Sequence, residues 1–449
     1  MAKQKIQLSD HFNYSRLLRF VLPCIGTMLF TSIYGVVDGL CVSNFVGKTA
    51  FAAVNLIMPL PMLIGTVGFM LGTGGSAIVG ITLGEGDEDK ANRYFSLFVL
   101  TAFLAGVALS VLGLFILRPV AILMGAKGEM LDFAVRYGRV LMVSVPTFIL
   151  QNMFQSFFVT AEKPTLGFWF TVGAGCTNMV LDVLMVGVWG WGVEGAAIAT
   201  FISQLVGGVL PVFYFIDRSN SSRLHLCQTK VYGGVLRDAC INGSSELMTN
   251  LSMSLVNILY NYQLLRLAGE NGVAAYGVIM YAAFLFVAVF VGYAVGSAPI
   301  VSFHYGARNH AEVHNLYRKS LRLIAVVAVT LTLASMFIIP CVARVFVGYD
   351  AELLALTSRA FRLYALSFLI MGFNVYASSF FTALGDGVTS ALISFLRTLA
   401  FQVIAILLLP MLLGIDGIWL AVTAAELAAL AVSAAMLLTK DKVFHYRKA

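Results

Sequence analysis

Long apolar stretches follow one another along nearly the whole chain, and no other feature restricts its fold as strongly. A membrane-spanning helix needs roughly 20 apolar residues, and it satisfies all of its own backbone polar groups within lipid. Charged residues make up 11% of the 449 positions, whereas a soluble protein carries about 25%. We therefore predict an all-α polytopic membrane protein. Its twelve expected transmembrane helices cover residues 17–44, 51–83, 93–117, 129–159, 164–189, 192–216, 236–266, 273–305, 320–347, 356–383, 388–413 and 416–438.

The distribution of lysine and arginine predicts how these helices are oriented. With the N-terminus inside, the inner segments carry about twice as many basic residues as the outer ones, as the positive-inside rule requires. This assigns both termini to the cytoplasm and explains the net charge of +7 without a nucleic-acid partner. Residues 1–16 are polar and the first span lacks a cleavage site, so we expect it to remain as an anchor. The prediction is a monomeric, multi-pass protein of the cytoplasmic membrane, with the lipid bilayer as its surroundings.

An internal repeat relates the two halves of the chain. The three pairs of related segments are 75–84 with 296–306, 159–165 with 381–387, and 192–200 with 414–422. Members of the last two pairs are 222 residues apart, and those of the first pair 221 or 222. A shared separation at three places indicates a duplicated unit.

The repeat length contains six expected helices, an even number, so both halves have the same topology. Such parallel repeats are typical of transporters, in which the substrate path runs between the halves. We predict two pseudo-symmetric six-helix bundles joined by a polar, basic linker on the cytoplasmic side. The predicted domains are an N-lobe at 1–216, the linker at 217–235, and a C-lobe with a cytoplasmic tail at 236–449.

Polar residues within the predicted spans of the N-lobe indicate an ion site. Asn178 and Asp182 are four residues apart and so share one helix face, Thr200 lies in the next span, and Asp38 lies in the first. An ionisable side chain inside a membrane is costly and marks function by default. Their oxygens suit a hard cation such as Na⁺, and two neighbouring carboxylates can instead share a proton. We expect H⁺ or Na⁺ as the coupling ion, with no cofactor and no other metal; local pairing of each acid with a backbone or hydroxyl group is the alternative.

The second half lacks these side chains at the positions 222 residues further on, which are Tyr260, Ala400, Ile404 and Val422. It has Glu246 instead, a candidate for binding substrate or cation, or for a structural role near a helix end. Arg397 and Glu426 are candidates for a structural ion pair between neighbouring spans, with a role in substrate binding as the alternative. The further polar residues expected to line a lumen are Gln151, Gln155 and Asn374.

Three parts of the sequence together resemble the multidrug and toxic compound extrusion (MATE) family. They are LPCIGTMLFTSIYGVVDGLCVSNFVG at 22–47, GTGGSAIVG with LGEGDEDKA at 72–91, and NMVLDVLMV with GWGVEGAAIATFISQ at 178–204. The resemblance extends over nearly the whole chain. The run 242–279 and the FTALGDG and GIDGIWLAVTAAE segments look most like the family's MepA-like branch.

This resemblance implies an antiporter that exports organic cations or drugs by alternating access, in exchange for H⁺ or Na⁺. The family's N-lobe cation site matches Asp38, Asn178, Asp182 and Thr200. A proline at which the first helix bends matches Pro23, and an acid in the seventh helix of some members matches Glu246. An acid that some members carry in the tenth helix has no counterpart in 356–383.

Other functions compete with this interpretation. A flippase for lipid-linked oligosaccharides, from the same superfamily, needs a basic lumen, and Arg397 is the one basic residue deep in a predicted span. GEGD at 84–87 superficially matches a membrane aspartyl-protease pattern, but its acids lie in a charged loop. We therefore predict that the protein is not an enzyme. A receptor or scaffold would differ from a transporter by the absence of ion-coupled flux.

Overall fold

The computed structural model describes residues 6–46, 48–348 and 350–447, with their side chains except those at 35–45, 48, 51, 345 and 346. Every regular element in this part of the chain is a helix, as predicted. The helices of the first half are α1 (Tyr14–Phe45), α2 (Lys48–Ile57), α3 (Pro59–Gly84), α4 (Glu88–Leu123), α5 (Gly128–Thr160), α6 (Pro164–Asp182), the π-helix η1 (Val183–Val188), α7 (Gly192–Gly208) and α8 (Leu210–Ile216). After α9 (Gly233–Asn242), the second half consists of α10 (Ser244–Gly306), α11 (His310–Val347), α12 (Ala351–Ala365), α13 (Phe368–Ala383), α14 (Gly387–Phe395), the π-helix η2 (Leu396–Ala400), α15 (Phe401–Leu413), α16 (Ile415–Thr439) and α17 (Asp441–Phe444).

The longest element, α10, consists of two antiparallel arms. Gly269 between them has φ 61° and ψ −152°, a conformation outside the helical region that favours glycine. The first arm (244–268) and the second arm (270–306) contact each other beside this turn. Tyr276 Oη donates to Asn257 Oδ1 at 2.7 Å, and the rings of Tyr260 and Tyr276 stack with centroids 4.9 Å apart. The arms correspond to the separate spans expected at 236–266 and 273–305.

Ten helices in the described part of the chain are long and apolar enough to cross a membrane. The pair α12 and α13, bent by 46°, raises the number to as many as eleven if it forms one span. Counting the two arms of α10 separately adds one more crossing. The count of twelve and the cytoplasmic location of the termini remain predictions.

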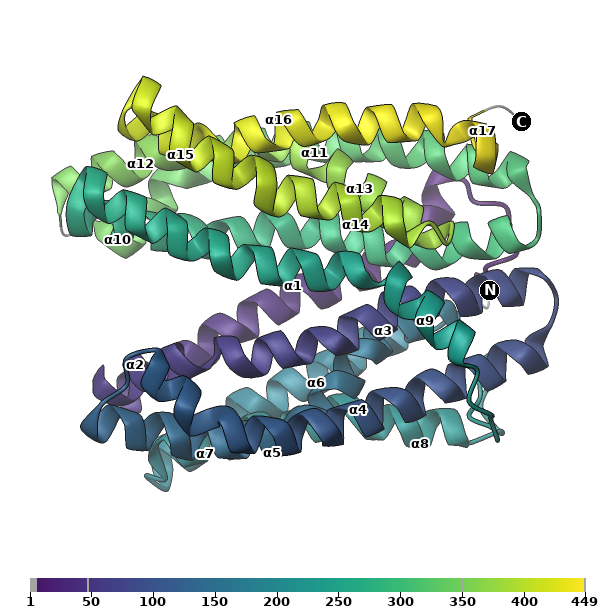
Figure 1. The fold of residues 1–449 in the computed structure, drawn as a ribbon, viewed down its shortest axis with the longest axis horizontal. Coiled ribbons are helices and arrows are strands. Elements are labelled where there is room, and N and C mark those ends of the chain that lie inside the picture. The colour runs from purple at the N-terminus through teal and green to yellow at the C-terminus, as the bar shows by residue number, and fades with distance from the viewer. Residues whose placement is uncertain (1–5, 47, 349, 448–449) are drawn as a thin grey trace.

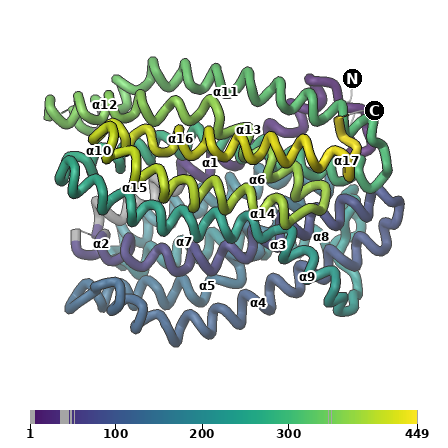
Figure 2. The backbone as a smooth tube through the Cα atoms, turned by 45° about the horizontal axis from the view of Figure 1, so that its top comes forward, coloured from purple at the N-terminus to yellow at the C-terminus, as the bar shows by residue number. Residues whose placement is uncertain are grey.

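The helices form two layers that lie side by side (Figure 1). Most first-half helices form one layer and the second-half helices form the other, while α1 lies between them and packs on both α6 and α10. Both chain termini lie at the same end of the molecule, which we call the terminal end (Figures 1 and 2). The linker segment runs along α4 there, where His225 N donates to Asn92 Oδ1 at 2.7 Å and Cys227 N to Ser96 Oγ at 2.9 Å. The domain limits 1–216, 217–235 and 236–449 remain predictions.

The sequence repeat is matched by the residues that cap the N-termini of two helices, α4 and α11. Asp87 caps the N-terminus of α4 by accepting a hydrogen bond from Lys90 N, and Asn309 caps α11 by accepting one from Glu312 N. The two caps are 222 residues apart. A side-chain oxygen at this position satisfies an amide that the helix itself leaves without an acceptor. The related segments therefore share local structure as well as sequence.

The two halves meet at the terminal end through glycines of the repeat. A Cβ atom on Gly84 of α3 would lie 2.0 Å from Phe303 O, and one on Gly306 of α10 would lie 2.0 Å from Ile81 O. These glycines occupy related positions in the two halves. Their hydrogen side chains let the two backbones approach closely, as small residues do at membrane helix interfaces. We call this contact between α3 and α10 the glycine seam.

Residues 6–13 form a strap over the same end of the molecule. Leu8 N donates to Glu162 Oε1 of the first half at 2.9 Å, and Phe12 N donates to Glu312 Oε1 of the second half at 2.9 Å. His11 Nδ1 lies 2.6 Å from Glu312 Oε2. Arg223 joins the halves as well, because it pairs with Glu162 at 3.3 Å and lies over the Phe303 ring. The strap and the seam together close the terminal end.

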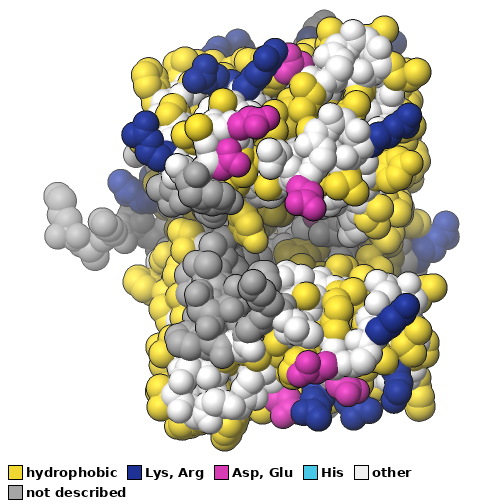
Figure 3. Space-filling model, turned by 90° about the vertical axis from the view of Figure 1, so that its left-hand side faces the viewer, with side chains coloured by type: hydrophobic (Ala, Val, Ile, Leu, Met, Phe, Trp, Pro, Cys, Tyr) yellow, Lys and Arg dark blue, Asp and Glu magenta, His cyan; other side chains and the backbone are white. Residues whose placement is uncertain are grey.

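The end opposite the termini is more open. A depression with hydrophobic side chains on its walls separates the two layers when the molecule is viewed from this side (Figure 3). The halves are thus in close contact at the terminal end, and a depression lies between them at the other.

Candidate functional site

A first-half cavity lies among α1, α3, α5, α6 and α7, with a volume of about 200 Å³. Its polar lining includes Thr31, Ser144, Asn178, Thr200 and Gln204. Asn178 Nδ2 donates to Thr200 Oγ1 at 3.4 Å, so the structure brings these two predicted site residues together across α6 and α7. A hydrogen bond of this length is weak, and these groups can reorient toward another partner.

Asp182 is the last residue of α6 and is completely buried. It lies one turn beyond Asn178 on the same helix face, and the π-helix η1 begins at the next residue. π-helical turns widen a helix locally and occur frequently at functional sites. Asp38 belongs to α1, but its side chain lies outside the described residues. Carboxylate, amide and hydroxyl oxygens are the donors that a hard monovalent cation or a proton needs.

The helix α1 contacts both halves around Pro23. Pro23 lacks an amide hydrogen, which removes one hydrogen bond from the helix interior. Thr27 Oγ1 donates to Pro23 O at 2.9 Å on the next turn. On one side, Gly26 of α1 lies close to Phe168 of α6; on the other, Gly292 of α10 approaches the α1 backbone at Ile25. A change in the shape of α1 would therefore alter its contacts with both halves.

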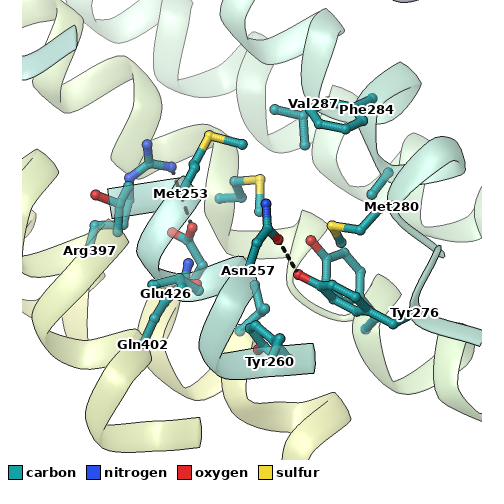
Figure 4. Close-up of a pocket in the computed structure, with 16 residues that line it drawn as sticks. Met253, Asn257, Tyr260, Tyr276, Met280, Phe284, Val287, Arg397, Gln402 and Glu426 are labelled. Atoms are coloured by element: carbon teal, nitrogen blue, oxygen red, sulfur yellow. Dashed lines mark hydrogen bonds and ion pairs between the residues drawn. The ribbon is translucent and has the colours of Figure 1, made fainter. Parts of the chain in front are cut away.

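A second-half cavity, with a volume of about 120 Å³, lies between the two arms of α10 and the segments α12, α13, η2, α15 and α16 (Figure 4). Arg397 and Glu426 line one end of it, and Arg397 Nη1 lies 3.4 Å from Glu426 Oε1. The side chains of Arg397 and Glu426 are 11% and 1% exposed. This is the contact that the sequence predicts between neighbouring spans. Arg397 lies within η2, so an ionisable residue accompanies a π-helical segment in each half.

Asn374, a predicted lumen residue, lies within the second half and is fully buried. Its Nδ2 donates to Glu426 Oε2 at 2.7 Å and to Glu426 O at 2.9 Å, while its Oδ1 accepts from Ser433 Oγ at 2.9 Å. Asn374 therefore fixes the carboxylate of Glu426. Of the other lumen candidates, Gln151 packs against Gly207 of α7, and Gln155 has a buried Oε1 without a hydrogen-bond partner among the described residues.

A central cavity lies between the halves, lined by α3 and α5 on one side and by α10, α13 and α14 on the other. Glu246 and Arg397 both line it, together with hydroxyl groups such as Ser76, Ser156 and Thr249. Arg397 thus borders two cavities. The sequence did not indicate that Arg397 lies between two cavities. It also did not indicate the stacking of Tyr260 on Tyr276, which line the second-half cavity. Both arrangements depend on how the two arms of α10 fold back on each other.

The competing enzyme pattern has a structural explanation. Asp87 of the GEGD segment lies in the loop before α4 and caps that helix. Among the described residues, no group of three or more His, Cys, Asp or Glu side chains could hold a metal ion. The arrangement as a whole consists of two related layers of membrane-length helices, closed at one end, with polar cavities inside apolar spans. It is the architecture of a membrane transporter.

Comparisons with known proteins agree with this class. The MatE family model matches residues 23–184 and again residues 247–408, once in each half. The chain belongs to the MatE family, whose members are transporters and not enzymes. The double match also coincides with the internal repeat.

Relatives and solved structures span the full length of the chain. The multidrug export protein MepA of Staphylococcus saprophyticus is 21% identical over 436 residues, which cover 96% of this chain and 95% of that protein. MepA of Staphylococcus aureus is 21% identical over 435 residues, with the same coverage. The structure of a MATE protein in complex with MaL6 superposes with a TM-score of 0.92 at 23% identity, covering 99% of this chain and 100% of that one. An outward-facing multidrug resistance MATE transporter superposes with a TM-score of 0.91 at 23% identity, covering both chains completely.

Proposed function

We propose that this chain is an antiporter that exports drugs or other organic cations across the cytoplasmic membrane in exchange for inward H⁺ or Na⁺. The relatives named multidrug export protein support the substrate class. The terminal end would face the cytoplasm, in agreement with the excess of basic residues on that side. We propose that the protein acts as a monomer without a cofactor.

The observation that supports ion coupling most directly is that Asp182 is completely buried one helical turn beyond Asn178, which itself contacts Thr200. A buried carboxylate is expensive to keep in a membrane span unless it is used. We propose that Asp38, Asn178, Asp182 and Thr200 bind the coupling ion. Protonation or Na⁺ binding there would remove net negative charge from a site of low dielectric constant, where charge differences have their largest effect.

The response to ion binding would pass through α1. Because Pro23 weakens this helix and α1 packs on both α6 and α10, a bend at Pro23 would change the cavity and the contact between the halves together. Opening toward the cytoplasm would require the glycine seam and the strap to separate. Rocking of one half against the other is the usual motion of transporters built from repeats.

The test is efflux of ethidium from proteoliposomes under a Na⁺ gradient or an H⁺ gradient, each imposed separately. We expect Asp182→Asn and Asp38→Asn to lower gradient-driven efflux about tenfold or more, because neither amide can exchange a proton or carry the charge that holds a cation. Efflux that responds to one gradient only would identify the coupling ion.

The matched control is Glu194→Gln, which neutralises a half-exposed acid at the start of α7 in the same half. It should leave efflux unchanged. Undiminished gradient-driven efflux in both Asp variants would refute the proposed ion site, and efflux independent of both gradients would refute the antiport mechanism.

A further inference from the structure

A groove on the outside of the first half runs between α1 and α6 and has a volume of about 620 Å³. Its α1 wall includes Ser15, Arg19 and Leu22, whose spacing of three or four residues places them on one helix face. Its α6 wall includes Thr165 and Trp169. Leu22 and Trp169 are 57% and 61% exposed, so the groove is open to the membrane around the protein.

The two helices come together at the deep end of this groove. A Cβ atom on Gly26 of α1 would lie 3.0 Å from the Phe168 ring of α6. Both residues line the groove, and so does Pro23, which lies one turn before Gly26. A molecule in the groove would therefore lie beside the residue at which we propose that α1 bends.

Polar and apolar side chains are separated along the groove. The start of α1 follows the strap, and the loop before α6 binds the strap through Glu162, so both helices begin at the terminal end. Ser15 and Thr165 belong to the first turns, whereas Leu22 and Phe168 lie further into the spans. A phospholipid has the same order, with a polar headgroup at the membrane surface and acyl chains in its core.

Arg19 gives the polar end of the groove a positive charge. Its side chain is exposed, and none of the ion pairs among the described residues includes it. A guanidinium group donates two parallel N–H bonds to phosphate oxygens, and the hydroxyls of Ser15 and Thr165 are further donors. Anionic lipids attract basic side chains near the membrane surface. The donors and the charge thus lie where the phosphate of a headgroup would be.

A second groove on the first half lacks this charge although its volume is also about 620 Å³. It lies beside α4, α8 and the linker segment, and its described lining residues include Phe103, Phe213 and Gln228 but no lysine or arginine. Both grooves have apolar walls that suit an acyl chain. The groove between α1 and α6 differs because it can also select the headgroup.

We propose that the groove between α1 and α6 is a binding site for a phospholipid whose headgroup has a net negative charge. The phosphate would accept hydrogen bonds from Arg19 and Ser15, and an acyl chain would lie against Leu22 and Trp169. A bound chain would add to the contact between α1 and α6 beside Pro23. The site lies on the outside of the helices, so its occupancy does not depend on the proposed transport.

The test is quenching of tryptophan fluorescence by brominated lipids, with the full chain in nanodiscs and no ion gradient. The reporter variant Trp189→Phe/Trp191→Phe keeps Trp169 as its one exposed tryptophan, because Trp419 is 1% exposed. Brominated phosphatidylglycerol and brominated phosphatidylcholine with the same acyl chains are compared. We expect phosphatidylglycerol to bind beside Trp169 about fivefold more strongly, the effect of one basic residue near anionic lipid.

The variants of Arg19 separate charge from shape. Arg19→Gln should abolish the preference at Trp169, and Arg19→Lys should keep most of it. The matched control is Arg318→Gln, which neutralises an exposed arginine on α11 and should leave the preference unchanged. In the complementary reporter Trp169→Phe, the exposed Trp189 and Trp191 should show less than about a twofold preference.

Equal quenching of Trp169 by the two lipids would make the groove an ordinary lipid contact and overturn the proposal. A preference that survives in Arg19→Gln would also overturn it. So would loss of the preference on adding inorganic phosphate at constant ionic strength, because the ligand would then be a free anion. Failure of ethidium efflux with the lipid preference intact would refute the antiport function alone.

Discussion

The two halves share a helix plan but bury opposite polar chemistry in it. In the first half, Asp182 ends α6 and shares its face with the amide of Asn178. In the second half, Arg397 lies within η2 and is paired with Glu426. Both ionisable residues accompany a π-helical segment, although the two segments are not at equivalent positions of the repeat. The comparison shows that one repeated helix plan carries different ionisable side chains in its two halves.

The largest expected difference between the two halves is in the free energy of unfolding that is lost when a buried acid is neutralised. Glu426→Gln leaves Arg397 buried without its counter-ion, and breaking a buried pair in this way costs about 3–5 kcal/mol. Adding Arg397→Gln should restore much of that loss, since no uncompensated charge remains. Asp182→Asn, which neutralises an acid beside an amide, should cost less than half as much. Thermal unfolding in detergent measures all four proteins.

The comparison would fail if Asp182→Asn and Glu426→Gln lowered the unfolding temperature equally. It would also fail if the double variant were no more stable than Glu426→Gln alone. Either result would indicate that the Arg397–Glu426 pair does not distinguish the second half energetically.

The glycine seam is where related positions of the two halves meet, and a single methyl group should disturb it. In Gly306→Ala the new Cβ would lie 2.0 Å from Ile81 O, which forces the backbones apart. Overpacking of this kind costs about 1–3 kcal/mol. We expect a longer distance across the terminal end, measured by electron–electron resonance between spin labels at the exposed positions Asp89 and Arg318.

Gly277→Ala is the control for this measurement, because a Cβ at Gly277 meets no atom within 4 Å. It lies in the same arm of α10 and should leave the distance unchanged. An unchanged distance in Gly306→Ala would contradict a rigid seam.

The smallest expected effect is a change in stability at one of two loops that the repeat relates, the loop before α6 and the loop before α14. The loop before α6 holds Glu162, which binds Leu8 N and Arg223. The related loop before α14 holds Asp386, whose carboxylate lies 2.8 Å from Lys440 Nζ. Burial alone would raise the pKa of Asp386, but the hydrogen bonds from Lys440 and Thr389 outweigh it and lower the pKa below its ordinary value.

A lowered pKa in the folded protein means that ionised Asp386 adds stability above the ordinary Asp pKa of about 4. That contribution is lost as the pH falls through the lowered value. Asp386→Asn should therefore cost on the order of 1 kcal/mol at neutral pH and nothing in strong acid. Unfolding temperatures across this range measure the effect, with the exposed Asp132→Asn as control. A difference that persists in strong acid would assign the effect to packing instead of charge.

Much of the fold could be predicted because its causes are local in sequence. Apolar length requires helices in lipid, and the repeat requires two related halves. Two side-chain contacts could also be predicted, because each joins helices that are neighbours along the chain. They are the contact between Asn178 and Thr200 and the pair of Arg397 with Glu426. The resemblance to the family added the expected roles of Asp38 and Pro23, which remain proposals.

The sequence by itself determined the class of protein, the duplicated plan and the small set of ionisable residues inside the spans. Only the tertiary structure decided how those residues are partnered. Asn374, which Ser433 holds in turn, donates to the Glu426 carboxylate, whereas Arg397 Nε has no hydrogen-bond partner among the described residues. Burial and hydrogen-bond partners are set by helices that meet in space, and no pattern along one helix records them.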